Sequence, residues 1–170
     1  MRDLSLDIVE GCDVTACLTE YFENTEVSVD CEQCGCDGAR KSGLIDTLPK
    51  CLMLHLKRFR GEGGGAKGSL TMRKGSELVT FGKALDLEGL CVPCKGAGGA
   101  GGAGGSNFEL KSVVRHVGAL DSSGHYVTDS LGKEGEWMNY NDSRVEKREE
   151  SDVLSGAVGR EAYLLMYERA

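Results

Sequence analysis

The sequence predicts an α+β protein built mainly on an antiparallel β-sheet, and three patterns support this fold class. Within residues 51–59, leucine occupies every second position from 52 to 56, which is the period of a β-strand. Further short apolar runs follow, and the run at 162–167 provides a closing strand. Only the stretch after Asp13 repeats its apolar residues over two full turns at helical spacing. Successive strands with few helices between them favour antiparallel pairing.

Composition limits the size and the partners of the protein. A chain of 170 residues can form one domain with a real core. The formal charge of -7 argues against nucleic acid or an anionic membrane as the main partner, and favours partners with basic segments. With no secretory leader and no bilayer-length apolar run, we expect an intracellular protein, cytoplasmic or nuclear, without a membrane partner. The eight cysteines are then expected to be reduced thiols.

The N-terminal part predicts a short strand at residues 4–8 and then a helix capped by Asp13. One face of this helix is apolar and should face the core: Val14, Cys17, Leu18, Tyr21 and Phe22. Cys17 is therefore interpreted as a small core residue rather than a reactive thiol.

A Cys-x-x-Cys pair at Cys31 and Cys34 has the spacing of a zinc knuckle, and the following Gly35 permits a tight turn. A complete site needs four ligands. The second pair, Cys91 and Cys94, lies far along the chain, so joint coordination is the less favoured reading. An unmetallated turn and an orphan half-site remain open alternatives for the first pair.

In the strand predicted at 51–59, leucines point to one side and Cys51, Met53 and His55 to the other. His55 alone is more often structural than catalytic. Glycines at 61–65 indicate a flexible connection, and 70–72 and 78–81 resemble strands. The glycine and alanine tract at 96–105 has no side chains to pack and predicts a mobile surface loop.

The stretch from His116 to Asn141 has the composition of the base half of a nucleophilic site. His116 and His125 each have a glycine nearby, and Asn141 and Asp142 follow an aromatic residue. A histidine that takes a proton from a nucleophile needs a third group to fix its tautomer, and Asn or Asp supplies it. A simple turn at Asn141 and Asp142 is the alternative reading. Strands are expected around 108–116, from 126, at 137–140 and at 162–167, and an acidic helical turn at 149–154.

Five motifs in this order resemble the ubiquitin-specific proteases, the papain-like deubiquitinases. They are Leu-Pro-Lys-Cys-Leu from Leu48 through Leu-Lys-Arg-Phe ending at Phe59, His-x-Gly at His116, Gly-His-Tyr at Gly124, Trp137 before Tyr140-Asn141-Asp142-Ser143, and the strand 162–167. Each motif alone is weak, but five in register are specific, and together they cover almost the whole chain.

The resemblance implies a papain-like cysteine protease fold, and this chain would be the C-terminal half of its catalytic domain. Residues 1–47 would form the helix and part of the zinc-binding fingers, 48–94 palm strands, 95–106 a flexible glycine and alanine loop, and 107–170 the palm with the histidine box. Ubiquitin and ubiquitinated proteins would be the partners, and hydrolysis of the isopeptide bond after the last glycine of ubiquitin the reaction. Cys31 and Cys34 would be half of a structural zinc site.

The resemblance also assigns roles to single residues. His125 would be the catalytic base and Asn141 its orienting residue, with Asp142 as runner-up or assistant. The channel for the ubiquitin tail would be lined by His116, Gly118, Gly124 and Tyr126, with Arg58 and Phe59 near it. Thr128, Asp129 and Ser130 stand where the family is apolar, which predicts a more polar and shorter strand behind the base.

The segment that carries the nucleophilic cysteine in that family has no counterpart here, so we expect the chain alone to be inactive. Two alternatives follow. One is a catalytically inactive ubiquitin-binding or scaffold module, which keeps the channel without the thiol. The other is a stand-alone zinc-ribbon adaptor, which predicts one bound zinc per chain.

Overall fold

The computed structural model describes residues 2–9, 11, 13–23, 25–63, 70–92, 105–118 and 124–170. The main-sheet strands are β1 (Arg2–Leu6), β4 (Cys51–Leu56), β7 (Ala84–Asp86), β8 (Asn107–Val117), β9 (His125–Leu131), β10 (Trp137–Asn141), β11 (Arg144–Arg148) and β12 (Ala162–Arg169). The hairpin strands are β2 (Thr25–Asp30), β3 (Asp37–Lys41), β5 (Phe59–Gly63) and β6 (Leu70–Lys74). The helices are α1 (Val14–Phe22), η1 (Glu88–Leu90), α2 (Glu150–Val153) and α3 (Gly156–Glu161).

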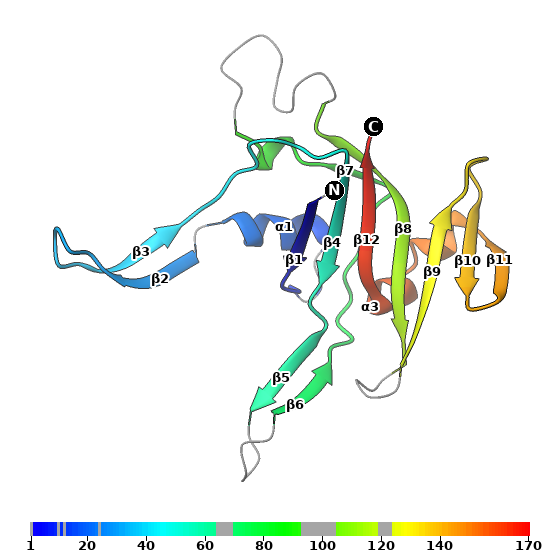
Figure 1. Cartoon of the computed structure of the whole chain (residues 1–170), viewed down its shortest axis with the longest axis horizontal. Coiled ribbons are helices and arrows are strands. Elements are labelled where there is room, and N and C mark those ends of the chain that lie inside the picture. The colour runs from blue at the N-terminus through cyan, green and yellow to red at the C-terminus, as the bar shows by residue number, and fades with distance from the viewer. Residues whose placement is uncertain are drawn as a thin grey trace.

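The eight-stranded sheet has the order β1-β4-β12-β8-β9-β10-β11, with β7 paired to β8 beside this path. β1 lies parallel to β4, and the remaining pairs in this sheet are antiparallel. The hairpins β2–β3 and β5–β6 project away from the sheet (Figure 1). The α+β class and the mainly antiparallel sheet predicted from sequence are confirmed.

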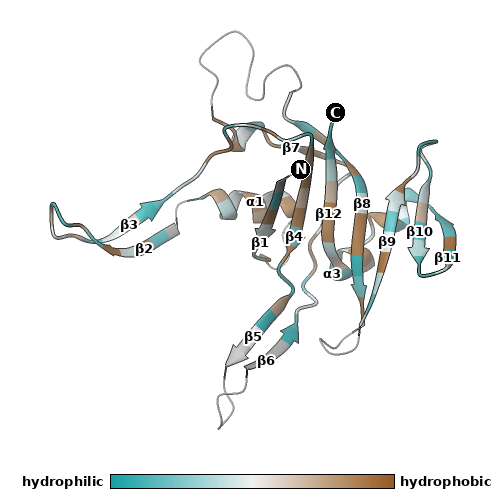
Figure 2. Cartoon of the chain, in the orientation of Figure 1, coloured by the Kyte–Doolittle hydropathy of each residue, from teal (hydrophilic) through white to brown (hydrophobic). Residues whose placement is uncertain are grey.

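The hydrophobic core lies on one face of this sheet. Burial alternates along β4, where Leu52, Leu54 and Leu56 are buried and the residues between them are half-exposed, as the period of two predicts. Figure 2 shows hydrophobic residues along β4, β12 and β8. Asp13 caps α1 by accepting from the Ala16 amide at 2.8 Å, and Cys17 is 1% exposed. The core role predicted for Cys17 is confirmed.

Several expectations need correction. The strand predicted at 51–59 ends at Leu56 and β5 starts at Phe59, because the chain turns tightly where the Arg58 amide donates to the Leu56 carbonyl at 2.8 Å. β5 also continues to Gly63, where a flexible connection was expected. Sequence reasoning did not predict β11 or α3. Cys12, Cys94 and residues 96–104 lie outside the described residues. Within the described part of the chain, no helix combines the length and apolarity needed to cross a bilayer.

Candidate active site

His125 and Asn141 meet on neighbouring strands. His125 is the first residue of β9 and Asn141 the last of β10. Tyr140 lies opposite Thr128, so Asn141 falls one diagonal step from His125 on the same face of the sheet. The distance from His125 Nε2 to Asn141 Oδ1 is 2.6 Å, and the His125 side chain is 45% exposed. The imidazole is therefore held by protein on one side and open to solvent on another.

This contact selects one tautomer of the imidazole. A carboxamide oxygen can only accept a hydrogen bond, so Nε2 of His125 carries the hydrogen and donates it to Asn141 Oδ1. The other nitrogen, Nδ1, then keeps its lone pair. A histidine in this state can accept a proton through Nδ1 while its orientation stays fixed.

Asp142 is placed less directly than Asn141. It occupies the turn between β10 and β11 with a φ of 51°, a left-handed conformation that Asp tolerates better than most residues. Its Oδ2 lies 3.7 Å from His125 Nε2, and its side chain is 81% exposed. Asp142 therefore forms the turn, while Asn141 makes the closer contact with His125.

An aromatic cluster adjoins this pair, because Tyr126 follows His125 on β9 and lies opposite His116 on β8. The ring of His116 packs edge-on against Phe59 at 5.2 Å and Tyr126 at 4.9 Å between centroids. Tyr163 of β12 joins the cluster beside Phe59 and Tyr126. His116 is 3% exposed, whereas Tyr126 is 51% exposed. Tyr126 can therefore form a surface for a ligand, with His116 supporting it from beneath.

Gly124 permits the chain to pass close to His116. A Cβ atom at Gly124 would lie 1.8 Å from Nε2 of His116, much closer than any real carbon contact. Gly118 has a φ of 115°, a conformation that favours glycine. Both glycines were predicted to line the channel, and the structure shows a local requirement for each.

Sequence reasoning missed Lys74, at the end of β6. Its Nζ donates to the carbonyl oxygens of His116 and Gly118, each at 2.6 Å. Burial lowers the pKa of the Lys74 ammonium below its ordinary value. Lys74 therefore fixes the end of β8 beside the candidate site. No pattern in the sequence could identify it, because both partners lie more than forty residues away.

The expectation that Arg58 contacts a ligand in the channel is corrected. Arg58 is 0% exposed, and its guanidinium donates to the carbonyls of Ala162 at 2.6 Å, Glu77 at 2.9 Å and Gly159 at 2.6 Å. These bonds tie the β4–β5 turn to α3 and β12. Arg58 is therefore a structural residue, because a buried guanidinium is stable only when its donors are satisfied.

A buried ionic network lies behind the base. Asp129 of β9 is 0% exposed and accepts from Arg115 Nε at 2.8 Å and Asn139 Nδ2 at 2.7 Å. Arg115 also donates to Glu161 of α3 at 2.9 Å. β9, which carries this polar residue, is seven residues long. The polar residue is accommodated because its charge is paired across β8, β9 and β10.

The described cysteines all lie on elements other than those that carry His125 and Asn141. Cys17 is in α1, Cys51 begins β4, and Cys91 follows η1. Cys31, Cys34 and Cys36 belong to the β2–β3 hairpin, where Gly35 adopts a φ of 66° and donates to the Cys31 carbonyl at 2.8 Å. In the described part of the chain, no set of three His, Cys, Asp or Glu side chains is arranged to hold a metal. Cys31 and Cys34 supply at most two ligands.

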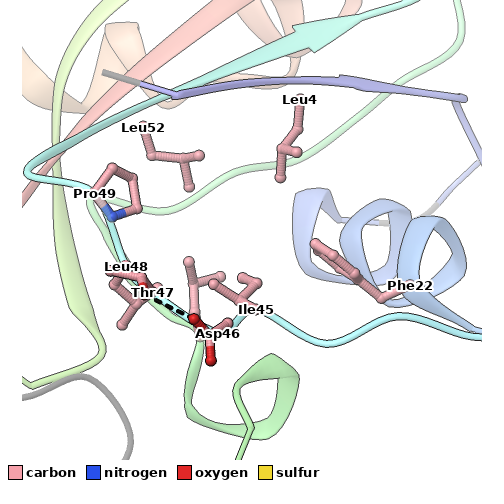
Figure 3. A pocket seen from close by; sticks show the side chains of 9 residues that line it. Leu4, Phe22, Ile45, Asp46, Thr47, Leu48, Pro49 and Leu52 are labelled. Carbon is pink, nitrogen blue, oxygen red and sulfur yellow. Dashed lines mark hydrogen bonds between the residues drawn. The ribbon is translucent and has the colours of Figure 1, made fainter.

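An apolar pocket of about 300 Å³ lies between β1, α1 and the segment before β4 (Figure 3). Leu4 of β1, Phe22 of α1 and Leu48 line it. In the sheet order, β4, β12 and β8 lie between β1 and β9, which carries His125. The pocket is therefore separate from the candidate active site.

The fold and the site define the class of protein. This is the fold of papain-like cysteine proteases, with an α+β architecture and a mainly antiparallel sheet. The family model described as "Ubiquitin carboxyl-terminal hydrolase" matches residues 10–167. The chain therefore belongs to the ubiquitin carboxyl-terminal hydrolase family.

Several relatives match almost the whole chain. Ubiquitin carboxyl-terminal hydrolase 44-B of Xenopus laevis is 30% identical over 158 residues, covering 92% of this chain and 21% of that protein. Ubiquitin carboxyl-terminal hydrolase 8 of Saccharomyces cerevisiae is 28% identical over 172 residues, covering 97% of this chain and 34% of that protein. The chain thus spans about a fifth to a third of these relatives' length.

Solved structures agree with this assignment. The SAGA Ubp8/Sgf11/Sus1/Sgf73 DUB module bound to ubiquitin aldehyde contains a chain with 29% identity and a TM-score of 0.77. The match covers 99% of this chain and 36% of that one. A further structure of a SAGA DUB module, bound to monoubiquitin, gives a TM-score of 0.75 at 28% identity.

Proposed function

We propose that this chain is the base-carrying part of a thiol-dependent deubiquitinase that hydrolyses the isopeptide bond after the C-terminal glycine of ubiquitin. The observation that carries the proposal is the contact between His125 and Asn141 beside an exposed aromatic surface. Membership of the ubiquitin carboxyl-terminal hydrolase family supports the choice of substrate.

The chemistry follows from the groups present. Nδ1 of His125 takes the proton from a cysteine thiol supplied from outside the described residues, and the thiolate attacks the glycine carbonyl carbon. The imidazolium then protonates the departing lysine amine. Water, deprotonated by the same imidazole, releases ubiquitin from the thioester. Asn141 keeps the ring oriented throughout, and Asp142 assists electrostatically.

Tyr126 is the proposed wall of the channel for the ubiquitin tail. His116 supports its ring, and Gly124 lies two residues before it. Phe59 supports this wall through its contact with His116. A flat aromatic surface suits an extended backbone with small residues, because glycines allow close approach.

The test uses the protein at its natural full length and ubiquitin carrying a C-terminal electrophile. We expect a covalent adduct that forms about 10²–10⁴-fold more slowly in His125→Ala, because proton transfer is lost. Ubiquitin affinity of the variant should stay near the wild-type value. Ubiquitin without its last two glycines, carrying the same electrophile, is the matched control and should not react.

The second candidate function is an inactive ubiquitin-binding scaffold. It is favoured by the distribution of described cysteines, which lie on elements away from β9 and β10. The scaffold predicts ubiquitin binding with no adduct in the same experiment. Absence of both binding and adduct would contradict both functions.

Zinc is proposed as a structural cofactor held in part by Cys31 and Cys34. Two thiolates at this spacing suit a tetrahedral site, and the remaining ligands would come from outside the described residues. Metal analysis of the purified 170-residue chain should give well under one zinc per chain. One equivalent would instead favour the zinc-ribbon adaptor.

A further inference from the structure

A basic pocket that includes Lys74, the residue bound to the end of β8, is not used by the proposed chemistry. Its volume is about 450 Å³. It is lined by Arg60 of β5, Arg73 and Lys74 of β6, Arg160 of α3, and the segment Gly75-Ser76-Glu77. Four cationic side chains and one carboxylate therefore surround one cavity, in a chain that has 20 basic and 27 acidic residues overall.

The arrangement of two of these cations opposes the stability of the hairpin. Arg60 lies directly opposite Arg73 in the β5–β6 register. Like charges facing each other across a strand pair are destabilising, and a two-stranded hairpin alone is only marginally stable. Glu77 offsets part of the charge, with Oε1 3.5 Å from Arg60 Nη1. A ligand with anionic groups would add favourable contacts with the guanidinium groups.

The lining also specifies the chemistry of the ligand. Guanidinium groups bind carboxylate and phosphate oxygens through paired hydrogen bonds. The cations come from two strands and a helix around a cavity of ligand size, so a segment with several anionic groups fits better than one small anion. We propose that this pocket binds an acidic or phosphorylated peptide segment.

The position of the pocket connects it with the active site. Lys74 lines the pocket and also donates to the carbonyls of His116 and Gly118. Choice of a protein segment as the ligand rests on the proposed function, because a ubiquitinated substrate brings its own chain to this region. The pocket would then favour conjugates with acidic residues near the modified lysine.

The test measures binding of a fluorescent peptide rich in Asp and phosphoserine to the full 170-residue chain, without ubiquitin. A peptide with Asn and Ser at the same positions is the ligand control. We expect the double variant Arg73→Gln, Arg160→Gln to bind about tenfold more weakly or worse. The matched double variant Arg40→Gln, Arg144→Gln removes the same charge from two exposed ion pairs and should stay within about twofold.

Equal weakening by both double variants would overturn the proposal, since it would show general charge attraction. Inorganic phosphate that competes as strongly as an equal concentration of the peptide would also overturn it. If the pocket variant fails to fold by circular dichroism, the charge-conserving pair Arg73→Lys, Arg160→Lys replaces it and should still weaken binding several-fold through loss of paired bonds. Because ubiquitin is absent, these outcomes are separate from the ubiquitin-probe result.

Discussion

Nε2 of His125 lies 2.6 Å from Oδ1 of Asn141, while Oδ2 of Asp142 lies 3.7 Å from the same nitrogen. Orientation of the base should therefore depend on Asn141 more than on Asp142. We expect Asn141→Ala to lower kcat by about 10²-fold or more, because the tautomer is no longer fixed. Asp142→Ala should cost less than about tenfold, since its carboxylate is exposed. Steady-state hydrolysis of a ubiquitin conjugate by the protein at its natural full length measures both. A larger loss for Asp142→Ala would reverse the assignment.

Substitution of Gly124 tests whether the backbone must pass close to the His116 ring. In Gly124→Ala the added methyl group must displace the His116 ring, whose Nε2 lies 1.8 Å from the built Cβ position. We expect a loss of about 1–3 kcal/mol in unfolding free energy, typical of overpacking, together with impaired ubiquitin binding. Gly89→Ala is the matched control, because no atom lies within 4 Å of its Cβ position. Similar urea midpoints for the two variants would contradict the prediction.

Lys74 should act as a positioning residue for the end of β8. Lys74→Met removes both bonds to the carbonyls of His116 and Gly118 and should lower kcat about tenfold, because small displacements near a site are costly. Lys74→Arg keeps the donors and should recover part of the rate. Lys57→Met removes an exposed lysine paired with Asp7 and serves as control. Hydrogen exchange at the amide of Gly118 should rise only in Lys74→Met.

Stability should fall as the pH drops below about 6.5. Burial, with nearby Lys74, lowers the pKa of His116, and burial, with nearby Lys57, lowers that of His55. As the pH falls through the pKa of histidine in the unfolded chain, the unfolded chain therefore binds protons before the folded chain does, and the free energy of unfolding decreases. This decrease ends below the pKa values of the two histidines in the folded chain. His116→Phe keeps a ring in the cluster and should flatten this slope. Urea unfolding between pH 8 and pH 5 measures it, and an unchanged slope in the variant would contradict the assignment.

The fold class and the pair His125 and Asn141 could be predicted from sequence because each depends on local patterns. Alternation along residues 51–56 determines which leucines face the core, and it does so whichever strand pairs beside them. His125 and Asn141 were recognisable because each belongs to a short motif. The break after Leu56 was not predicted, since the alternating pattern continues past it while the backbone turns.

The remaining features depended on long-range contacts. Sequence placed Arg58 near the channel, yet its guanidinium is satisfied by carbonyls of residues 19 to 104 positions away, which no local pattern encodes. The opposition of Arg60 and Arg73 likewise becomes visible only when the hairpin register is known.

The sequence by itself determined the periodicities, the caps and the residue types available for proton transfer, because these are properties of neighbouring residues. Tertiary structure alone decided which donors and acceptors meet. The cost of burying a polar group unpaired selects one arrangement of distant partners. That arrangement gives Lys74, Arg58 and Asp129 their roles.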